Sequence, residues 1–218
     1  MRTFLAHMNS RNKNIFKEGK RYTFSDYFDM SHPTAEIVHA LGYSLTTQII
    51  KLHNAPEQHY QQELERISTT YYNLIPKISL NSEAAKREIM IAPVLQALLQ
   101  YVNGILNIEY SIDINDKLSG TIDYLMSSSQ ELIVIEAKKG DLERGFNQLA
   151  AEMIALDLYD TETELTTIYG AITIGEVWRF ALLERATKHL IKDVHTFRFP
   201  EDLQQLFAIL LGIVNPPN

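Results

Sequence analysis

The sequence predicts a mixed α/β fold, in which a central mixed β-sheet is flanked by helices and preceded by an N-terminal helical extension. Three observations lead to this prediction: apolar residues that alternate with a period of two, stretches with helical periodicity between them, and the order of these segments. The segments expected to be strands are 108–114, 120–126, 131–137, 166–174 and 177–183, with a last short strand at 195–199. Because one helical stretch separates the third strand from the fourth, we expect both parallel and antiparallel pairing.

The third strand and the helix after it have the clearest patterns. The run Leu132-Ile133-Val134-Ile135 is continuously apolar, which is typical of a central strand buried on both faces. Asp141 then caps a helix that continues to about Tyr159. Its residues at core spacing are Leu142, Phe146, Leu149, Met153 and Leu156.

Other helices are expected before and after this unit. Ser82 caps a helix that ends at Gly104, and Pro93 requires a kink or a break within it. Helical periodicity is also found at 34–41, 57–75 and 200–214. We therefore divide the chain into residues 1–79, an N-terminal arm and helical extension packed on the core, and residues 80–218, the core domain.

Composition limits the classes of protein that need to be considered. The 218 residues contain no cysteine, which excludes disulfides and thiolate metal sites. No apolar run approaches the roughly 20 residues of a membrane helix, and the N-terminus lacks a secretory pattern, so we expect a cytoplasmic protein without membrane contact.

The net charge of −7 argues against strong nonspecific binding to nucleic acid. The charge is uneven, because residues 1–25 hold six lysines and arginines against Glu18, a local balance of +5. A basic arm of this kind could contact phosphates, although a short solvated tail explains the same composition.

One group of residues indicates chemistry: Asp123 on the second strand, and Glu136 and Lys138 at the end of the third. Side chains alternate along a strand, so Glu136 and Lys138 point to one face and Ala137 to the other. If the intervening turn is centred between Ser129 and Gln130, Asp123 lies directly opposite Glu136, with Cβ atoms about 5 Å apart.

Two carboxylates at this distance repel each other unless a cation lies between them. Their oxygens suit Mg²⁺ or Mn²⁺. A bound metal lowers the pKa of a water molecule, and a neighbouring lysine orients the hydroxide and offsets charge on a phosphate. The set therefore favours metal-dependent hydrolysis of phosphodiesters.

The pattern Gly120-x-x-Asp123, followed by a hydrophobic strand ending Glu136-x-Lys138, resembles the PD-(D/E)XK (restriction-endonuclease-like) nucleases, with Ile122 in place of the proline of the family name. Three flanking elements strengthen the resemblance, which is nearest to the nuclease-like domains of type I restriction subunits. The elements are Glu83, Arg87 and Pro93-x-Leu95 on the preceding helix, Gln148 about ten residues after the Glu-x-Lys motif, and the Gly170-x-x-Thr173-x-Gly175 strand pair with Trp178. The N-terminal TFSDYF segment resembles uncharacterised cyanobacterial proteins.

The resemblance implies a restriction-endonuclease-like domain over 80–218. It makes Asp123 and Glu136 metal ligands, together with the backbone carbonyl of Ala137, and gives Lys138 the role of acting on water or phosphate. It places Glu83 in the outer shell or at a second metal. Gln148 would position the Glu-x-Lys strand or the substrate.

Structural readings compete with several of these roles. Asp123 could simply form an ion pair with Lys138, and Glu83 in a first helical turn is explained by the helix dipole. The remaining alternatives are Glu88 in place of Glu83, Lys139 in place of Lys138 if a bulge shifts the register, an Arg87–Glu83 ion pair, a plain Gln148–Glu152 hydrogen bond, and Trp178 as a core residue.

The function expected from the sequence is a Mg²⁺-dependent nuclease that acts on DNA. Alternatives are a catalytically silent binding or scaffold protein on the same fold, a nuclease specific for RNA or structured DNA, and a small metal-binding protein with another task. Because phosphate binding needs lysine and arginine contacts, we also expect a homodimer or a partner protein to supply basic surface.

Overall fold

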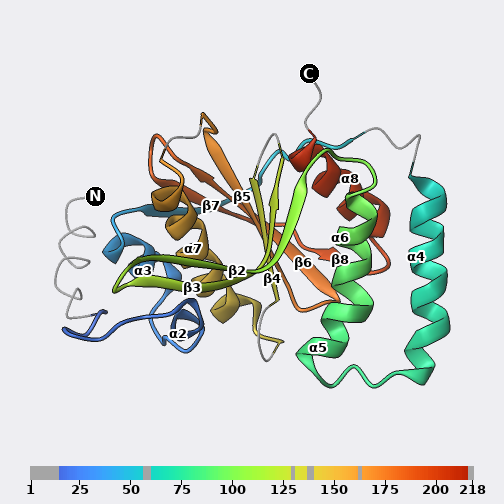
Figure 1. Ribbon diagram of the computed structural model, residues 1–218, viewed down its shortest axis with the longest axis horizontal. Coiled ribbons are helices and arrows are strands. Elements are labelled where there is room, and N and C mark those ends of the chain that lie inside the picture. Colours follow the sequence, from blue (N-terminus) through green and yellow to red (C-terminus); the bar gives the residue numbers. More distant parts are fainter. Residues whose placement is uncertain (1–14, 56–59, 129–130, 137–139, 162–163, 216–218) are drawn as a thin grey trace.

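The central feature of the molecule is an eight-stranded mixed sheet (Figure 1). The computed structural model describes residues 15–55, 60–128, 131–136, 140–161 and 164–215, with 131–136 described as backbone alone. The strands are β1 (Ser44–Gln48), β2 (Ile105–Asn115), β3 (Leu118–Ser127), β4 (Glu131–Glu136), β5 (Thr167–Thr173), β6 (Val177–Glu184), β7 (His189–Asp193) and β8 (Phe197–Arg198). Their order is β1-β7-β6-β5-β4-β3-β2, and β8 pairs with β6. Since β1/β7 and β4/β5 are parallel and the other pairs antiparallel, the predicted mixed sheet is confirmed.

Helices cover both faces of this sheet. They are α2 (Phe24–Phe28), α3 (Thr34–Ala40), α4 (Gln61–Leu74), the 3₁₀ segment η2 (Ile75–Lys77), α5 (Glu83–Lys86), the π-helical segment η3 (Arg87–Ile91), α6 (Ala92–Leu98), α7 (Leu142–Tyr159) and α8 (Leu203–Val214). Among the helices of the described chain, none has the length and apolar character needed to cross a membrane.

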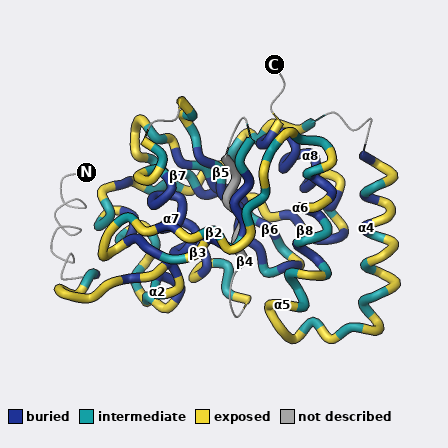
Figure 2. Tube along the Cα trace, viewed as in Figure 1, coloured by how far each residue is buried: buried dark blue, intermediate teal, exposed yellow. Residues whose placement is uncertain are grey.

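Buried segments lie on both faces of the sheet (Figure 2), and their apolar side chains form two separate hydrophobic cores. The α7 core joins α7, α2 and α3 to the sheet and includes Phe146, Leu149 and Ile172. The α8 core joins α4, α6 and α8 to the other face and includes Trp178 and Phe207. The helix predicted over 141–159 is confirmed, because the Asp141 carboxylate accepts hydrogen bonds from the backbone of the first turn and the predicted apolar positions face the sheet.

The helix predicted from Ser82 to Gly104 is divided in the structure. Ser82 caps α5 as expected, with its hydroxyl accepting from the Ala85 backbone at 3.1 Å. The backbone N–H of Ala92 then bonds to the carbonyl of Arg87, which forms a π-helical turn just before α6, and Pro93 is the second residue of α6. Since proline has no N–H to give to a helix interior, the break falls beside it, and α6 ends at Leu98.

The extension before residue 80 contributes a strand as well as helices. The strand β1 (Ser44–Gln48) pairs in parallel with β7 (His189–Asp193), and neither strand was expected from the sequence. Both have only five residues and no strict alternation, and they meet across about 145 residues of chain. The short strand expected at 195–199 is reduced to the two residues of β8.

Candidate functional site

The candidate site lies at the C-terminal end of the central strand β4. The last residue of β4, Glu136, pairs with Thr173 on β5, and Thr173 pairs with Trp178 on β6. The segment α5–η3 crosses this end of the sheet. It packs tightly on the β5–β6 turn, since a Cβ added at Gly175 would lie 2.8 Å from the sulfur of Met90.

The register of the β3–β4 hairpin differs by one residue from the predicted one. The observed pairs run from Ser127↔Glu131 to Tyr124↔Val134. Continuing this register by one step places Asp123 opposite Ile135, so the prediction that Asp123 lies directly opposite Glu136 is wrong. With strict alternation, Asp123 would also be on the same face as Leu125, which belongs to the α7 core.

Alternation is interrupted at Asp123, however. Leu118 and Ile122 lie in the α7 core, whereas Tyr124 and Met126 lie in the α8 core, although all four are even-numbered positions of one strand. The side chains of β3 therefore change faces between Ile122 and Tyr124, at the position of Asp123.

The neighbouring strand β2 changes faces at the same level. Tyr110 packs on the α7 core and Leu106 on the α8 core, and Glu109 between them has a φ of 56°. A positive φ is uncommon for a residue other than glycine. The pairs Ile108↔Tyr124 and Tyr110↔Ile122 flank this point, so Glu109 is the residue across from Asp123.

The change of face brings Asp123 to the side of the sheet where α5 and η3 lie. An oxygen of its carboxylate is 3.9 Å from Nη1 of Arg87, the first residue of η3, and Nη2 of Arg87 is 3.9 Å from the Glu109 carboxylate. The Asp123 side chain is 24% exposed. The Arg87 guanidinium thus lies between the Asp123 carboxylate, which is partly exposed, and the Glu109 carboxylate, which is largely exposed. Arg87 is within ion-pair distance of both Asp123 and Glu109.

Glu83 and Glu88 are both exposed, Glu83 at the start of α5 and Glu88 in η3. Glu83 is four residues before Arg87, a spacing that places two helical side chains on one side. This spacing favours Glu83 over Glu88, and the choice between them remains a prediction.

The predicted site residues at the end of β4 are described only in part. The backbone of Glu136 is placed by β4, while Ala137, Lys138 and the alternative Lys139 lie outside the described residues. Within the described part of the chain, no three histidine, aspartate or glutamate side chains gather closely enough to hold a metal ion. The predicted metal ligands therefore remain predictions.

Gln148 lies on α7, which covers the opposite face of the sheet from α5 and η3. It is buried, and its amide donates to the carboxylate of Glu152 at 2.9 Å. Glu152 is fully buried, an uncommon position for a carboxylate. The structure thus shows the plain hydrogen bond that was the alternative to a catalytic role, and the role of Gln148 in positioning the Glu-x-Lys strand or the substrate remains a prediction. Trp178 is fully buried in the α8 core, as its structural reading predicted.

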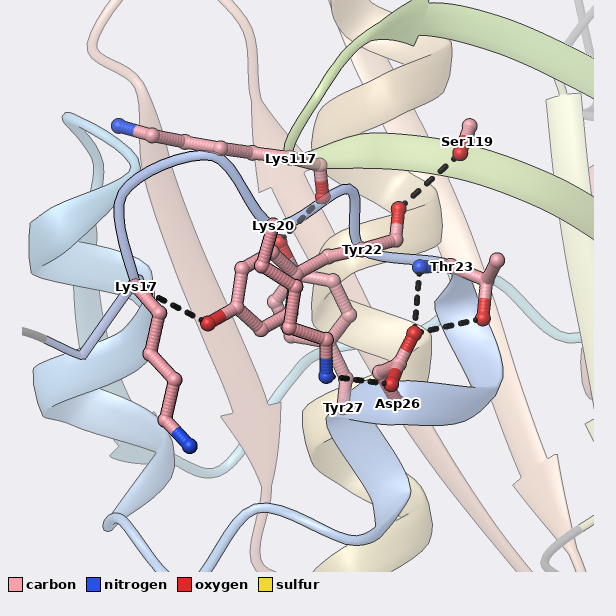
Figure 3. Close-up of polar contacts among 8 residues, drawn as sticks. All are labelled: Lys17, Lys20, Tyr22, Thr23, Asp26, Tyr27, Lys117 and Ser119. Atoms are coloured by element: carbon pink, nitrogen blue, oxygen red, sulfur yellow. Dashed lines mark hydrogen bonds and ion pairs between the residues drawn. The ribbon is translucent and has the colours of Figure 1, made fainter.

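The part of the basic N-terminal arm that the structure describes is held against the β2–β3 hairpin (Figure 3). Tyr27 donates to the Lys117 carbonyl, and Ser119 donates to the Tyr22 carbonyl. Lys20 forms an ion pair with Asp26 at 2.8 Å, and this hydrogen bond is the main reason that the pKa of Asp26 is lowered. Arg21 likewise pairs with Asp113. These two cations are engaged within the protein, which weakens the case for the arm as a phosphate contact.

Sequence reasoning did not single out Glu109. It occupies an ordinary place in an alternating segment, and only the backbone conformation reveals its position across from Asp123.

Comparisons of the chain with protein-family models, with curated proteins and with solved structures found no match.

Proposed function

We propose that this protein is a Mg²⁺-dependent nuclease that acts on DNA, built on a restriction-endonuclease-like sheet. The observation that carries the proposal is the change of face at Asp123. It turns this carboxylate toward η3 at the end of the sheet where β4 terminates in Glu136. In the proposed site, Asp123, Glu136 and the carbonyl of Ala137 hold Mg²⁺ or Mn²⁺, and Lys138 orients the attacking water.

The chemistry of the donor set supports this reading. Carboxylate and carbonyl oxygens are the ligands that Mg²⁺ prefers, and the metal would supply a water of lowered pKa and a positive charge beside the phosphate. Arg87 is placed to hold the Asp123 carboxylate and then to offset charge on the substrate. Glu83 would act from the outer shell, and Gln148 would have an indirect role through the packing of α7 on the sheet.

A second candidate function rests on the same contact. Because Arg87 already places a positive charge beside Asp123, this carboxylate is neutralised without a metal. A fold of this kind could serve as a catalytically silent binding or scaffold protein. The two functions differ in whether a divalent cation binds at Asp123.

A cleavage assay tests the proposal, using duplex DNA, single-stranded DNA, a branched DNA and RNA, each with Mg²⁺, Mn²⁺ or EDTA. We expect Asp123→Asn and Lys138→Ala to lower the cleavage rate by at least about a hundredfold. Asp113→Asn, an exposed acid of β2 paired with Arg21, is the matched control and should leave cleavage unchanged. Activity that survives both site variants would refute the assignment. If no substrate is cut, calorimetry with Mn²⁺ distinguishes the two functions. Native protein that shows no more heat of Mn²⁺ binding than Asp123→Asn would favour the scaffold.

The acidic chain leads to a proposal about assembly. At a net charge of −7, a single copy offers little basic surface, so we propose that a homodimer or a partner protein completes the DNA-binding groove. Sedimentation of the active species tests this directly. A monomer that cleaves DNA efficiently at physiological salt contradicts it.

A further inference from the structure

Two positively charged side chains meet beneath the first turn of α7. Arg179 projects from β6 and Lys192 from β7, and both reach the Glu143 carboxylate. Nη1 of Arg179 is 2.8 Å from one oxygen of Glu143, and Nζ of Lys192 is 2.5 Å from the other. The ammonium of Lys192 also lies 4.7 Å from the centre of the Phe146 ring. The two cations are thus held close together by a single acid.

The three side chains differ greatly in exposure. Lys192 is 11% exposed and Arg179 is 20% exposed, whereas Glu143 is 68% exposed. Two mostly buried cations are therefore covered by a carboxylate that can move into solvent. The Asp157–Arg185 ion pair differs, because both of its side chains are largely buried, at 10% and 12% exposure.

The donors of this pair are not all used. Within the described chain, Nε of Arg179 is buried and has no hydrogen-bond partner. The backbone N–H groups of Glu143 and Arg144 are already bound by Asp141, so the capacity to bind an anion comes from the side chains of β6 and β7. Two cations against one carboxylate leave a local charge of +1.

This cluster is near the end of β4. Arg179 pairs with Ile172 on β5, and Ile172 pairs with Ile135, the residue before Glu136. Two strand spacings of about 4.8 Å separate the backbone of Arg179 from that of β4. The Arg179 side chain lies on the α7 face of the sheet, opposite to the face on which α5 and η3 lie.

We propose that Arg179 and Lys192 bind a backbone phosphodiester of a nucleic acid, and that Glu143 occupies this site in the free protein. The inference rests on the proposed function in that the ligand is the nucleic-acid substrate. A phosphodiester has the charge of the carboxylate and more acceptor oxygens, so it can replace Glu143 without leaving a buried cation unpaired. Glu143 then acts as an internal competitor, which limits binding by this acidic protein to ligands that can displace it.

The test measures binding without cleavage. A fluorescent DNA duplex is titrated in EDTA, and anisotropy gives the dissociation constant over a range of salt concentrations. The variants are Glu143→Gln, the double variant Glu143→Gln/Arg179→Gln, and the control Glu65→Gln. The control removes the same charge from an exposed position on α4. Thermal unfolding of each variant confirms that it is folded.

We expect Glu143→Gln to bind the duplex on the order of tenfold more tightly than the native chain. Its affinity should also fall more steeply with salt concentration, by the amount that about one additional phosphate contact produces. Glu65→Gln should bind like the native chain, and adding Arg179→Gln should remove the gain. The inference is overturned if folded Glu143→Gln binds no better than Glu65→Gln, or if the Arg179 substitution leaves the gain intact. A gain in binding without any metal-dependent cleavage would keep this site and reject the proposed nuclease activity, so the two failures are distinguishable.

Discussion

Substituting Arg185 by methionine tests how α7 is held at its C-terminal end. The guanidinium of Arg185 donates to the Asp157 carboxylate at 2.7 Å and to the backbone carbonyls of Asp157, Asp160 and Leu165. The same carboxylate accepts from the hydroxyl of Tyr43 at 2.6 Å. Methionine keeps the length of the apolar stem, removes the charge, and leaves a largely buried carboxylate with one hydrogen-bond donor.

The magnitude follows from burial. Because Asp157 and Arg185 are 10% and 12% exposed, removing one partner leaves a charge with little solvent, a change that costs about 3–5 kcal/mol. In a chain of this length, that loss lowers the melting temperature by roughly 6–20 °C. Tyr43→Phe removes one hydrogen bond to the same charge and should cost about 1.5–3 kcal/mol. Burial, followed by the bond to Asp157, raises the pKa of Tyr43, so it remains a donor at neutral pH.

Urea unfolding followed by fluorescence is a suitable assay, because Trp178 is the single tryptophan and is fully buried. Arg198→Met provides the control, since Arg198 forms an exposed ion pair with Asp202 and its loss should barely move the midpoint. A cost below about 1 kcal/mol for Arg185→Met would show that the network does not anchor α7 as argued.

Three further substitutions have defined outcomes. Gly212→Ala should destabilise the protein by about 1–3 kcal/mol in urea, since its Cβ would meet the His53 carbonyl, and an unchanged midpoint would contradict this packing. Asp26→Asn should cost stability at pH 7, and urea unfolding at successively lower pH should show this cost disappearing. The hydrogen bond from Lys20 is the main reason that the pKa of Asp26 is lowered, so the contribution of Asp26 is present above the unfolded-state value of 3.8 and is lost as pH falls through the lower folded-state value. Glu109→Gly should be neutral or stabilising by up to about 1 kcal/mol, because glycine adopts positive φ freely, and a loss of stability would contradict the strained backbone at this position.

The elements that the sequence predicted correctly are those with local signals. The helix α7 has a capping aspartate and apolar residues at regular spacing, and β4 is a continuous apolar run. The strands β1 and β7 have no such signal, because their pairing joins distant parts of the chain and their side chains are mixed in character. The division beside Pro93 was expected, but its form as a π-helical turn, which lies against the β5–β6 turn, was not.

The candidate site was likewise predicted only in part. The spacing of Asp123 from the β4 motif indicated a hairpin, but a turn that shifts pairing by one residue also reverses the face of every side chain. Sequence pattern does not fix a turn to that accuracy. The positive φ of Glu109 was equally inaccessible, because a glutamate in an alternating segment carries no sign of it.

The hairpin register and the change of face have opposite effects on Asp123, and together they determine on which face of the sheet its carboxylate lies. The observed register alone would direct Asp123 into the α7 core, where a carboxylate without a partner would be costly. The change of face at Glu109 and Asp123 reverses this direction and brings the carboxylate to Arg87. A hairpin that only needed stability could have placed an apolar residue at position 123 with regular alternation. Keeping an acid there, beside a cation and partly exposed to solvent, requires an irregular backbone in two adjacent strands. Backbone irregularities of this kind concentrate at functional sites. For this reason Asp123, more than any other residue that the structure describes, is where the proposed metal chemistry should be tested first.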